Sequence, residues 1–142
     1  MKGTGTIFFI LFVLTANLQN AESKKLSPQE MKEVLQPLTK HCIERVGTDP
    51  KMIDDAIKGN FASDWRLQCF FKCILVNTKM IKDDKIVEKA ITNIIEIMLL
   101  EEHVAPYKKA VEHCIPAVKK LKGCALAYEF IKCCYDQAIT VR

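Results

Sequence analysis

Glycine and proline are scarce in this sequence, which has five of each among 142 residues. An all-β fold with many tight turns would need more of both, so the composition argues against that class. Long apolar runs are also missing. No segment after residue 21 offers the roughly 18 uninterrupted apolar residues of a transmembrane helix, which argues against stable insertion in a membrane.

Arginine is rare as well, and the positive charge of the chain comes mostly from lysine. The densest basic cluster is Lys119, Lys120 and Lys122, which lies between two predicted helices and is interpreted as a solvated turn. Nucleic-acid binding would require a basic stripe interleaved with aromatic residues, or a known motif. The sequence contains neither, so no nucleic-acid partner is expected.

Catalytic and metal-binding motifs are poorly supported. His41-Cys42 and His113-Cys114 pair two metal-ligating residue types, but adjacent residues on a helix diverge by about 100°. Tyr135-Asp136 after two cysteines resembles the helix of secreted phospholipases, without their catalytic histidine or glycine-rich calcium loop. We therefore expect a protein that is not an enzyme and has no metal or cofactor.

The N-terminus has the layout of a secretory signal peptide. A single Lys2 precedes an apolar run from Ile7 to Leu14, and small and polar residues follow. Cleavage is predicted after Ala21, with Ala16 as the alternative. The predicted organisation is a signal peptide at residues 1–21 and one domain at residues 22–142. The mature chain would be secreted, and its cysteines would meet an oxidising environment.

Helix signals cover most of the mature chain. The first helix has a strong start at Ser27-Pro28-Gln29-Glu30, with a Ser cap, Pro at the first position and Glu three residues after the cap. Six helices are predicted: from Ser27 through Cys42 to the break at Gly47, from Pro50 to Gly59, from Ser63 or Asp64 to Asn77, from Asp83-Asp84 to about Leu100, from near Pro106, and from about Gly123 to Ala138.

The fourth predicted helix is the most apolar. Its later part, IIEIMLL, is apolar on nearly all sides, which is typical of a helix buried on several faces. We expect it to be the central helix, wrapped by the others.

Seven cysteines lie at positions 42, 69, 73, 114, 124, 133 and 134. Cys69 and Cys73 are one helical turn apart, where Cβ atoms sit about 5 to 6 Å from each other, whereas a disulfide needs about 3.5 to 4.5 Å. They are expected to bond to two different helices. Nine residues of helix rotate Cys124 and Cys133 to opposite faces, so each of these also reaches a different neighbour. Six cysteines allow 15 pairings, so spacing alone leaves the connectivity open.

The cysteine spacing, Cys42-x26-Cys69-x3-Cys73-x40-Cys114-x9-Cys124-x8-Cys133, resembles the signature of the insect odorant-binding proteins, the pheromone and general odorant-binding family. The resemblance extends from about Ser27 to Tyr135. It implies an all-α, six-helix, disulfide-stapled domain around an internal hydrophobic cavity. It also implies the pairs Cys42–Cys73, Cys69–Cys124 and Cys114–Cys133.

Cys134 is an addition to this pattern. It could replace Cys133 in the bridge to Cys114, remain a free thiol, or pair between molecules. Helical projection places it on an apolar face near Ala127, Ile131 and Ala138, so it is interpreted as a small buried hydrophobe.

The two phenylalanines between Cys69 and Cys73 project in different directions, so one is expected to pack between helices and the other to line the cavity. Tyr128 is the favoured single ligand contact, because its hydroxyl could orient a polar group of a ligand inside an apolar wall. For any single residue, ordinary core is an equally good interpretation. The complete set of candidate ligand-binding residues is Trp65, Phe71, Leu75, Met80, Ile91, Ile94, Ile95, Met98, Leu99, Tyr128, Ile131, Tyr135 and Ile139.

The predicted function is that of a secreted carrier, which binds small hydrophobic ligands such as odorants or pheromones and solubilises them. The alternatives are a non-olfactory carrier in haemolymph, gland or gut, and a saposin-like lipid binder, whose cysteine spacing differs. An olfactory receptor or a second copy of the chain are the macromolecular partners considered. The last four residues, from Ile139, are expected to fold back over the cavity as a lid.

Overall fold

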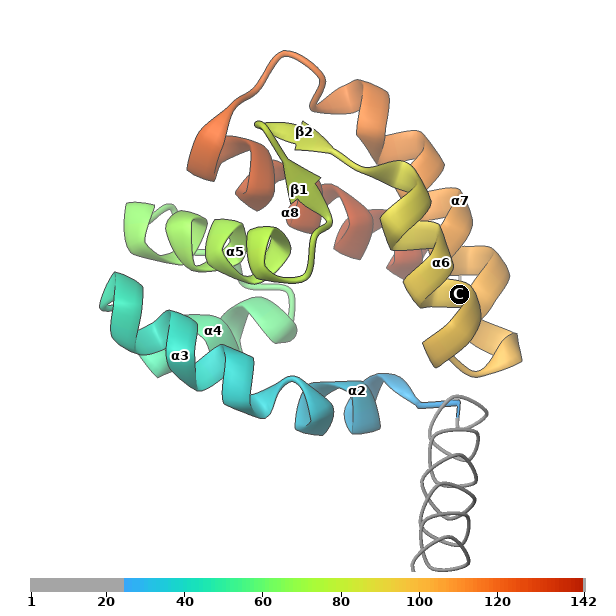
Figure 1. The fold of residues 1–142 in the computed structure, drawn as a ribbon, viewed down its shortest axis with the longest axis horizontal. Coiled ribbons are helices and arrows are strands. Elements are labelled where there is room, and N and C mark those ends of the chain that lie inside the picture. Colours follow the sequence, from blue (N-terminus) through green and yellow to red (C-terminus); the bar gives the residue numbers. More distant parts are fainter. Residues whose placement is uncertain (1–24, 142) are drawn as a thin grey trace, which may run out of the picture.

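The computed structural model describes residues 25–141, so the predicted signal peptide lies outside the described residues. Seven helices and one short hairpin follow each other in this range (Figure 1). They are α2 (Pro28–Val34), α3 (Gln36–Val46), α4 (Pro50–Ile57), α5 (Trp65–Asn77), β1 (Ile81–Lys82), β2 (Lys85–Ile86), α6 (Glu88–Met98), α7 (Glu101–Ala117) and α8 (Gly123–Val141). The expected all-α class is confirmed.

Helix α8 is the centre of the domain. Its most extensive contacts are with α5 and α7, while α3 packs on α5 and α6 packs mainly on α7 (Figure 1). The expectation that the isoleucine-rich helix would be central was wrong. That helix is α6, and Ile97 on its outer face is 55% exposed. Only Ile91 and Ile95 of α6 are fully buried, because it contacts the bundle through one face.

The first predicted helix is divided into α2 and α3 at Leu35. The start at Ser27 was predicted correctly, since its hydroxyl accepts a hydrogen bond from the backbone N–H of Glu30 at 3.2 Å. Pro37 explains the division. Proline has no N–H to donate to the preceding turn, and it disfavours helical geometry at the residue before it.

Asp83 and Asp84 form the turn of a hairpin instead of opening a helix. Both have positive φ, 52° and 58°, which is the backbone geometry of a tight two-residue hairpin turn and is tolerated by aspartate. The strands pair antiparallel, with Ile81 opposite Ile86. Helix α6 therefore begins at Glu88, four residues later than the turn.

Two other boundaries differ from the prediction. Helix α7 begins at Glu101, and Pro106 lies inside it. The sequence analysis expected this helix to begin near Pro106, but the helix continues through the proline, which has no backbone N–H to donate to the preceding turn. Helix α8 continues to Val141, so the backbone of the expected lid extends the helix and does not fold back.

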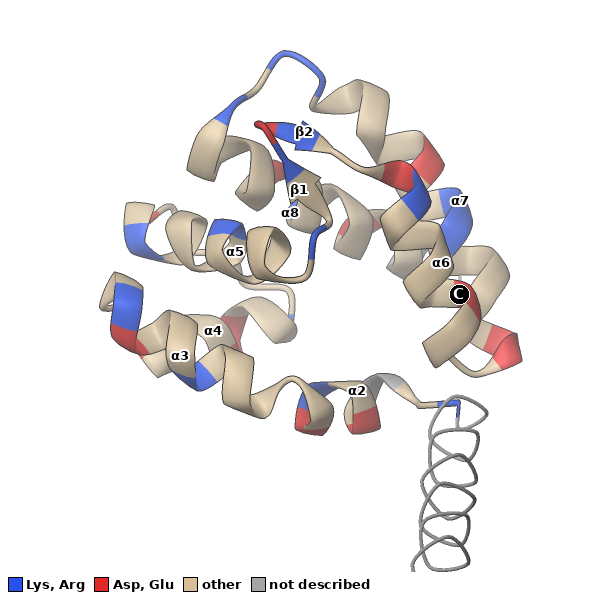
Figure 2. Cartoon of the chain, viewed as in Figure 1, with Lys and Arg blue, Asp and Glu red and all other residues tan. Residues whose placement is uncertain are grey.

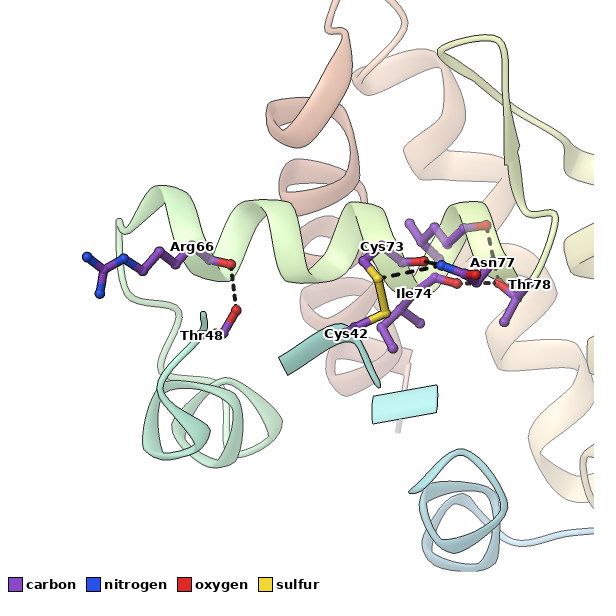
Figure 3. The surroundings of a disulfide bond; sticks show 8 residues. Cys42, Thr48, Arg66, Cys73, Ile74, Asn77 and Thr78 are labelled. Carbon is purple, nitrogen blue, oxygen red and sulfur yellow. Dashed lines mark hydrogen bonds between the residues drawn. A yellow bond between two sulfur atoms is a disulfide. The ribbon is translucent and has the colours of Figure 1, made fainter. Parts of the chain in front are cut away.

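The buried side chains form two clusters. The larger one joins residues of α6, α7 and α8 with the hairpin, and includes Ile95, Val111 and Phe130. The smaller one joins α3, α4 and α5 to α8, and includes Ile53, Leu67 and Tyr128 of α8. Phe71 packs against both clusters. Thr48 is the one polar residue that is buried in the described part of the chain, and its hydroxyl donates to the carbonyl of Arg66 at 3.0 Å (Figure 3).

Three disulfides tie the helices together, and they are the pairs that the family resemblance implied. Cys42–Cys73 joins α3 to α5, Cys69–Cys124 joins α5 to α8, and Cys114–Cys133 joins α7 to α8. Figure 3 shows the first of them, with the side-chain amide of Asn77 donating to the carbonyl of Cys73 at 2.7 Å. Neighbouring cysteines on α5 thus reach two different helices.

Removal of the Cys42–Cys73 disulfide tests this framework. The bond closes a sequence separation of 31 residues, and Cys42 is 0% exposed. Replacing both cysteines by alanine should lower the free energy of unfolding by about 2 to 4 kcal/mol, because the unfolded chain regains entropy. Denaturant unfolding of the double variant and of the parent measures the difference. An unchanged midpoint would contradict the assigned role of the bond.

Candidate functional site

An apolar cavity of about 520 Å³, partly open to solvent, lies between the helices. Its walls come from α4, α5, α6, α7 and α8, together with Phe61 after α4 and Met80 after α5. This volume is in the range of small-molecule sites, which are concave and mostly apolar. The cavity is therefore the candidate functional site.

Seven of the residues that the sequence analysis proposed are brought together around this cavity. They are Phe71, Leu75, Met80, Ile91, Ile95, Ile131 and Tyr135. The expectation for the two phenylalanines of α5 is confirmed, since Phe70 is buried in the smaller cluster while Phe71 lines the cavity. Whether these side chains contact a ligand remains a prediction.

The other candidates lie elsewhere in the described structure. Trp65 is the first residue of α5, where its side chain is 63% exposed and stacks with the guanidinium of Arg66 at 5.6 Å. Leu99 is buried, and its backbone forms an isolated parallel β-bridge with Leu26, the residue before the N-cap of α2. Ile94 and Met98 are half-buried on α6 and do not line the cavity. The side chain of Ile139 lies outside the described residues.

Eight lining residues were missed by the sequence analysis. They are Ala56, Ile57, Phe61, Tyr107, Val111, Phe130, Cys134 and Ala138. Cys134 and Ala138 were placed on the correct apolar face of their helix, but not assigned to the cavity. The alignment of Tyr107 and Val111, four residues apart on one helical face, is a signal that could have identified α7 as a wall.

Phe61 organises one side of the cavity. Its ring lies 6.3 Å from the ring of Phe71, 6.1 Å from that of Tyr128 and 5.6 Å from that of Tyr135, measured between centroids. The contacts with the two tyrosines are edge-to-face, the arrangement that the charge distribution of aromatic rings favours. This loop residue thus links α5 to two turns of α8.

Tyr128 belongs to this aromatic group, but its side chain is buried and does not line the cavity. Its hydroxyl donates a hydrogen bond to the backbone carbonyl of Phe61 at 3.3 Å. That bond holds the loop after α4 against α8. The hydroxyl that the sequence analysis favoured as a ligand contact is therefore already paired within the protein.

Two other tyrosines carry hydroxyls at the cavity. Tyr135 lies one position from Cys134 on α8, and Tyr107 lies on α7. Within residues 25–141, neither hydroxyl forms a hydrogen bond with a protein group. In an otherwise apolar wall, such hydroxyls are available to a polar atom of a ligand.

Gly59 sets the position of the Tyr135 ring. A Cβ atom at residue 59 would lie 2.9 Å from the tyrosine hydroxyl, closer than non-bonded atoms normally approach. The glycine also has φ of 98°, a left-handed conformation that other residues rarely adopt. The turn after α4 therefore requires glycine for two reasons, and its small size leaves room for the ring of Tyr135, which lines the cavity.

Cys134 is a free thiol on the cavity wall. Burial raises the pKa of this thiol to about 12, because a thiolate in an apolar environment loses its hydration. The thiol is consequently protonated at neutral pH and acts as a small apolar side chain. Among the alternatives considered for this residue, the structure contains the free thiol, with Cys133 in the bridge to Cys114.

The described part of the chain contains neither a metal-binding cluster nor a membrane-spanning helix. Across residues 25–141, no three histidine, cysteine or acidic side chains converge as a metal site would need. No helix in the same range has the length and apolar character to cross a membrane.

Comparisons with known proteins point to one family. The model of the PBP/GOBP family matches residues 24–137. Odorant binding protein 4 of Chrysopa pallens has a similar structure, with a TM-score of 0.70 and 27% identity over 79% of this chain and 92% of its own. Odorant binding protein 5 of Apis mellifera has a TM-score of 0.66 and 20% identity over 80% of this chain and 93% of its own. No curated protein sequence matches the chain.

The thiol of Cys134 gives a direct test of burial at the cavity. At pH 8 its reaction with a disulfide reagent such as 5,5′-dithiobis(2-nitrobenzoate) should be on the order of a thousandfold slower than that of an exposed cysteine peptide, since only the thiolate reacts. The rate should keep rising through pH 10, because the pKa is about 12. The reaction rate is measured from the change in absorbance, by stopped flow or by manual mixing.

A Cys134→Ser variant is the control, and it should give no reaction at all. Peptide mapping of the unreduced protein should show Cys114 joined to Cys133 and leave Cys134 alone. A rate that levels off near pH 9 would contradict the burial of this thiol.

Proposed function

Because the chain belongs to the PBP/GOBP family, we propose that it is a secreted carrier that binds small hydrophobic ligands in its apolar cavity and solubilises them in an aqueous fluid. The observation that supports this proposal most is the cavity of about 520 Å³ with apolar walls and two tyrosines. The names of the two similar structures, both odorant binding proteins, agree with this ligand class. Odorants, pheromones and similar semiochemicals are the proposed ligands.

The mechanism is transfer of an apolar molecule from water to the cavity. A ligand of about a dozen heavy atoms buries roughly 300 Å² of its surface, which contributes on the order of 7 kcal/mol. Burial of the cavity wall adds to this, and the loss of translational and rotational freedom subtracts several kcal/mol. The balance corresponds to dissociation constants around micromolar, or about 8 kcal/mol. Such binding needs no chemical step, and we propose no enzymatic activity.

Two residues of the wall bear on how a ligand would be accommodated and how it would enter. Met80 has a flexible and polarisable side chain that adapts to its neighbours. Ile57 is 50% exposed although it lines the cavity, so it stands between the interior and solvent. We propose that ligands enter beside Ile57, between α4 and the later part of α8.

A cavity-filling substitution tests the location of binding. Met80→Trp should place an indole in the cavity and weaken binding of ethylbenzene and 2-phenylethanol at least tenfold, because the ligand and the new ring compete for one volume. Displacement of a fluorescent apolar probe measures both affinities. Val34→Trp is the matched control, since Val34 is 53% exposed on α2 and outside the cavity. Equal affinity in the two variants would place the ligand elsewhere.

The hydroxyl of Tyr135 should contribute to selectivity. Tyr135→Phe keeps the ring and should weaken binding of 2-phenylethanol by about 0.5 to 1.5 kcal/mol, the net value of a neutral hydrogen bond, with little effect on ethylbenzene. Tyr128→Phe is the comparison, because its hydroxyl already donates to Phe61. That variant should lower stability without changing the preference for the alcohol. If both ligands lose affinity equally in Tyr135→Phe, the tyrosine is only a packing residue.

A further inference from the structure

A second cavity, partly open to solvent and also of about 520 Å³, lies between the β1–β2 hairpin and the loop that joins α7 to α8. Its walls include Ile86 of the hairpin, Ile115 of α7, Leu121 of the loop and Leu126 of α8. No lining residue is shared with the carrier cavity. We call it the hairpin cavity.

A buried layer separates the two cavities. On α8, Leu126 lines the hairpin cavity and Phe130, one turn later, lines the carrier cavity. Ala127 of α8 and Cys114 of α7, which are both 0% exposed and line neither cavity, belong to the same buried cluster as these two residues.

The rim of the hairpin cavity is positively charged. Lys85 and Lys119 line it, and Figure 2 shows further basic residues on β1 and on the loop between α7 and α8. Across residues 25–141, the ion pairs are Lys108 with Glu96 and His103 with Glu102, so neither rim lysine is paired there. Both lysines are exposed at the edge of the cavity, where Asp84 is the acidic residue of the lining.

The acidic residues of the hairpin offset this charge only in part. Asp83 and Asp84 form the turn. The hairpin (residues 81–86) and the loop between α7 and α8 (residues 118–122) together carry five lysines against these two aspartates. Asp84 also lines the cavity, but its carboxylate accepts a hydrogen bond from the backbone N–H of Gly123 at 3.1 Å. Gly123 is the first residue of α8, where the positive end of the helix dipole favours a carboxylate. Asp84 is thus engaged by the helix, whereas the lysines remain available.

We propose that the hairpin cavity is a second binding site, for a monomeric amphiphile with an anionic carboxylate head group. The alkyl chain packs on the walls formed by Ile86, Ile115 and Leu126, and the carboxylate faces Lys85 and Lys119. Two exposed ammonium groups at the rim attract a carboxylate and give a neutral hydrocarbon no such contribution, so the rim favours the anion. This site does not depend on the proposed carrier function, since no residue is common to both.

Stoichiometry with dodecanoate tests the proposal. Native mass spectrometry and NMR with carboxyl-labelled dodecanoate should detect two bound molecules in the unmodified chain and one in Ile115→Trp, whose indole fills the hairpin cavity. Leu121→Trp is a second filling variant in case the first is unstable, and circular dichroism checks the fold of both. Neutral dodecan-1-ol should bind once in all of these proteins, in the carrier cavity. No binding of dodecan-1-ol, together with one dodecanoate that is lost in Ile115→Trp, would therefore count against the carrier function alone.

Charge variants identify the head-group contact. Lys85→Gln combined with Lys119→Gln should weaken the second dodecanoate about tenfold, and raising the salt from about 20 to about 300 mM should reduce the same affinity. Lys40→Gln with Lys51→Gln removes two exposed lysines of α3 and α4 and should change neither site. A dodecanoate stoichiometry that is the same in the unmodified chain and in both filling variants would overturn the proposal. Another overturning result is that no second dodecanoate binds, while binding to phosphatidylglycerol vesicles requires Lys85 and Lys119. That result would assign these lysines to contact with a membrane surface.

Discussion

Helix α8 is held by covalent bonds on two opposite sides, and the rest of the domain depends on this constraint. Cys124 near its start bonds to α5, and Cys133 bonds to α7 nine residues later. Since nine residues rotate a helix by about two and a half turns, the two bonds leave from opposite faces. The helix can neither rotate nor move away from either neighbour. The third disulfide extends the framework to α3 through Cys42.

This framework explains how the domain keeps an open interior. A cavity costs stability, because the side chains around it lack dispersion contacts on one side. Cross-links that restrict the unfolded chain offset such a loss without adding side chains to the core. None of the bonded cysteines lines the carrier cavity, which α8 lines with Phe130 and Ile131 before Cys133 and with Cys134 directly after it. A free thiol at that place adds little polarity, because it stays protonated.

The chemistry of the cavity is set by which polar groups the fold has already used. Tyr128 and Tyr135 are two turns apart on α8, and both rings pack against Phe61. The hydroxyl of Tyr128 holds the loop after α4, whereas that of Tyr135 has no hydrogen-bond partner in the described part of the chain. The same distinction applies at the hairpin, where Asp84 caps α8 and Lys85 and Lys119 remain unpaired. Specificity in both cavities would then come from groups that folding leaves free.

The sequence by itself determined the helical class, most helix positions and the separation of Cys69 from Cys73, because these follow from local periodicity and from the geometry of one helix. Resemblance to a family supplied the disulfide pairs, which spacing left open. Only the tertiary structure decided that α8 is central instead of α6, and that Tyr135 faces the cavity instead of Tyr128. A helical projection gives the angle between two side chains of one helix, but not which neighbour stands opposite each face. The hairpin at Asp83-Asp84 was missed for a related reason: pairing of Ile81 with Ile86 depends on a turn whose residues also suit the start of a helix.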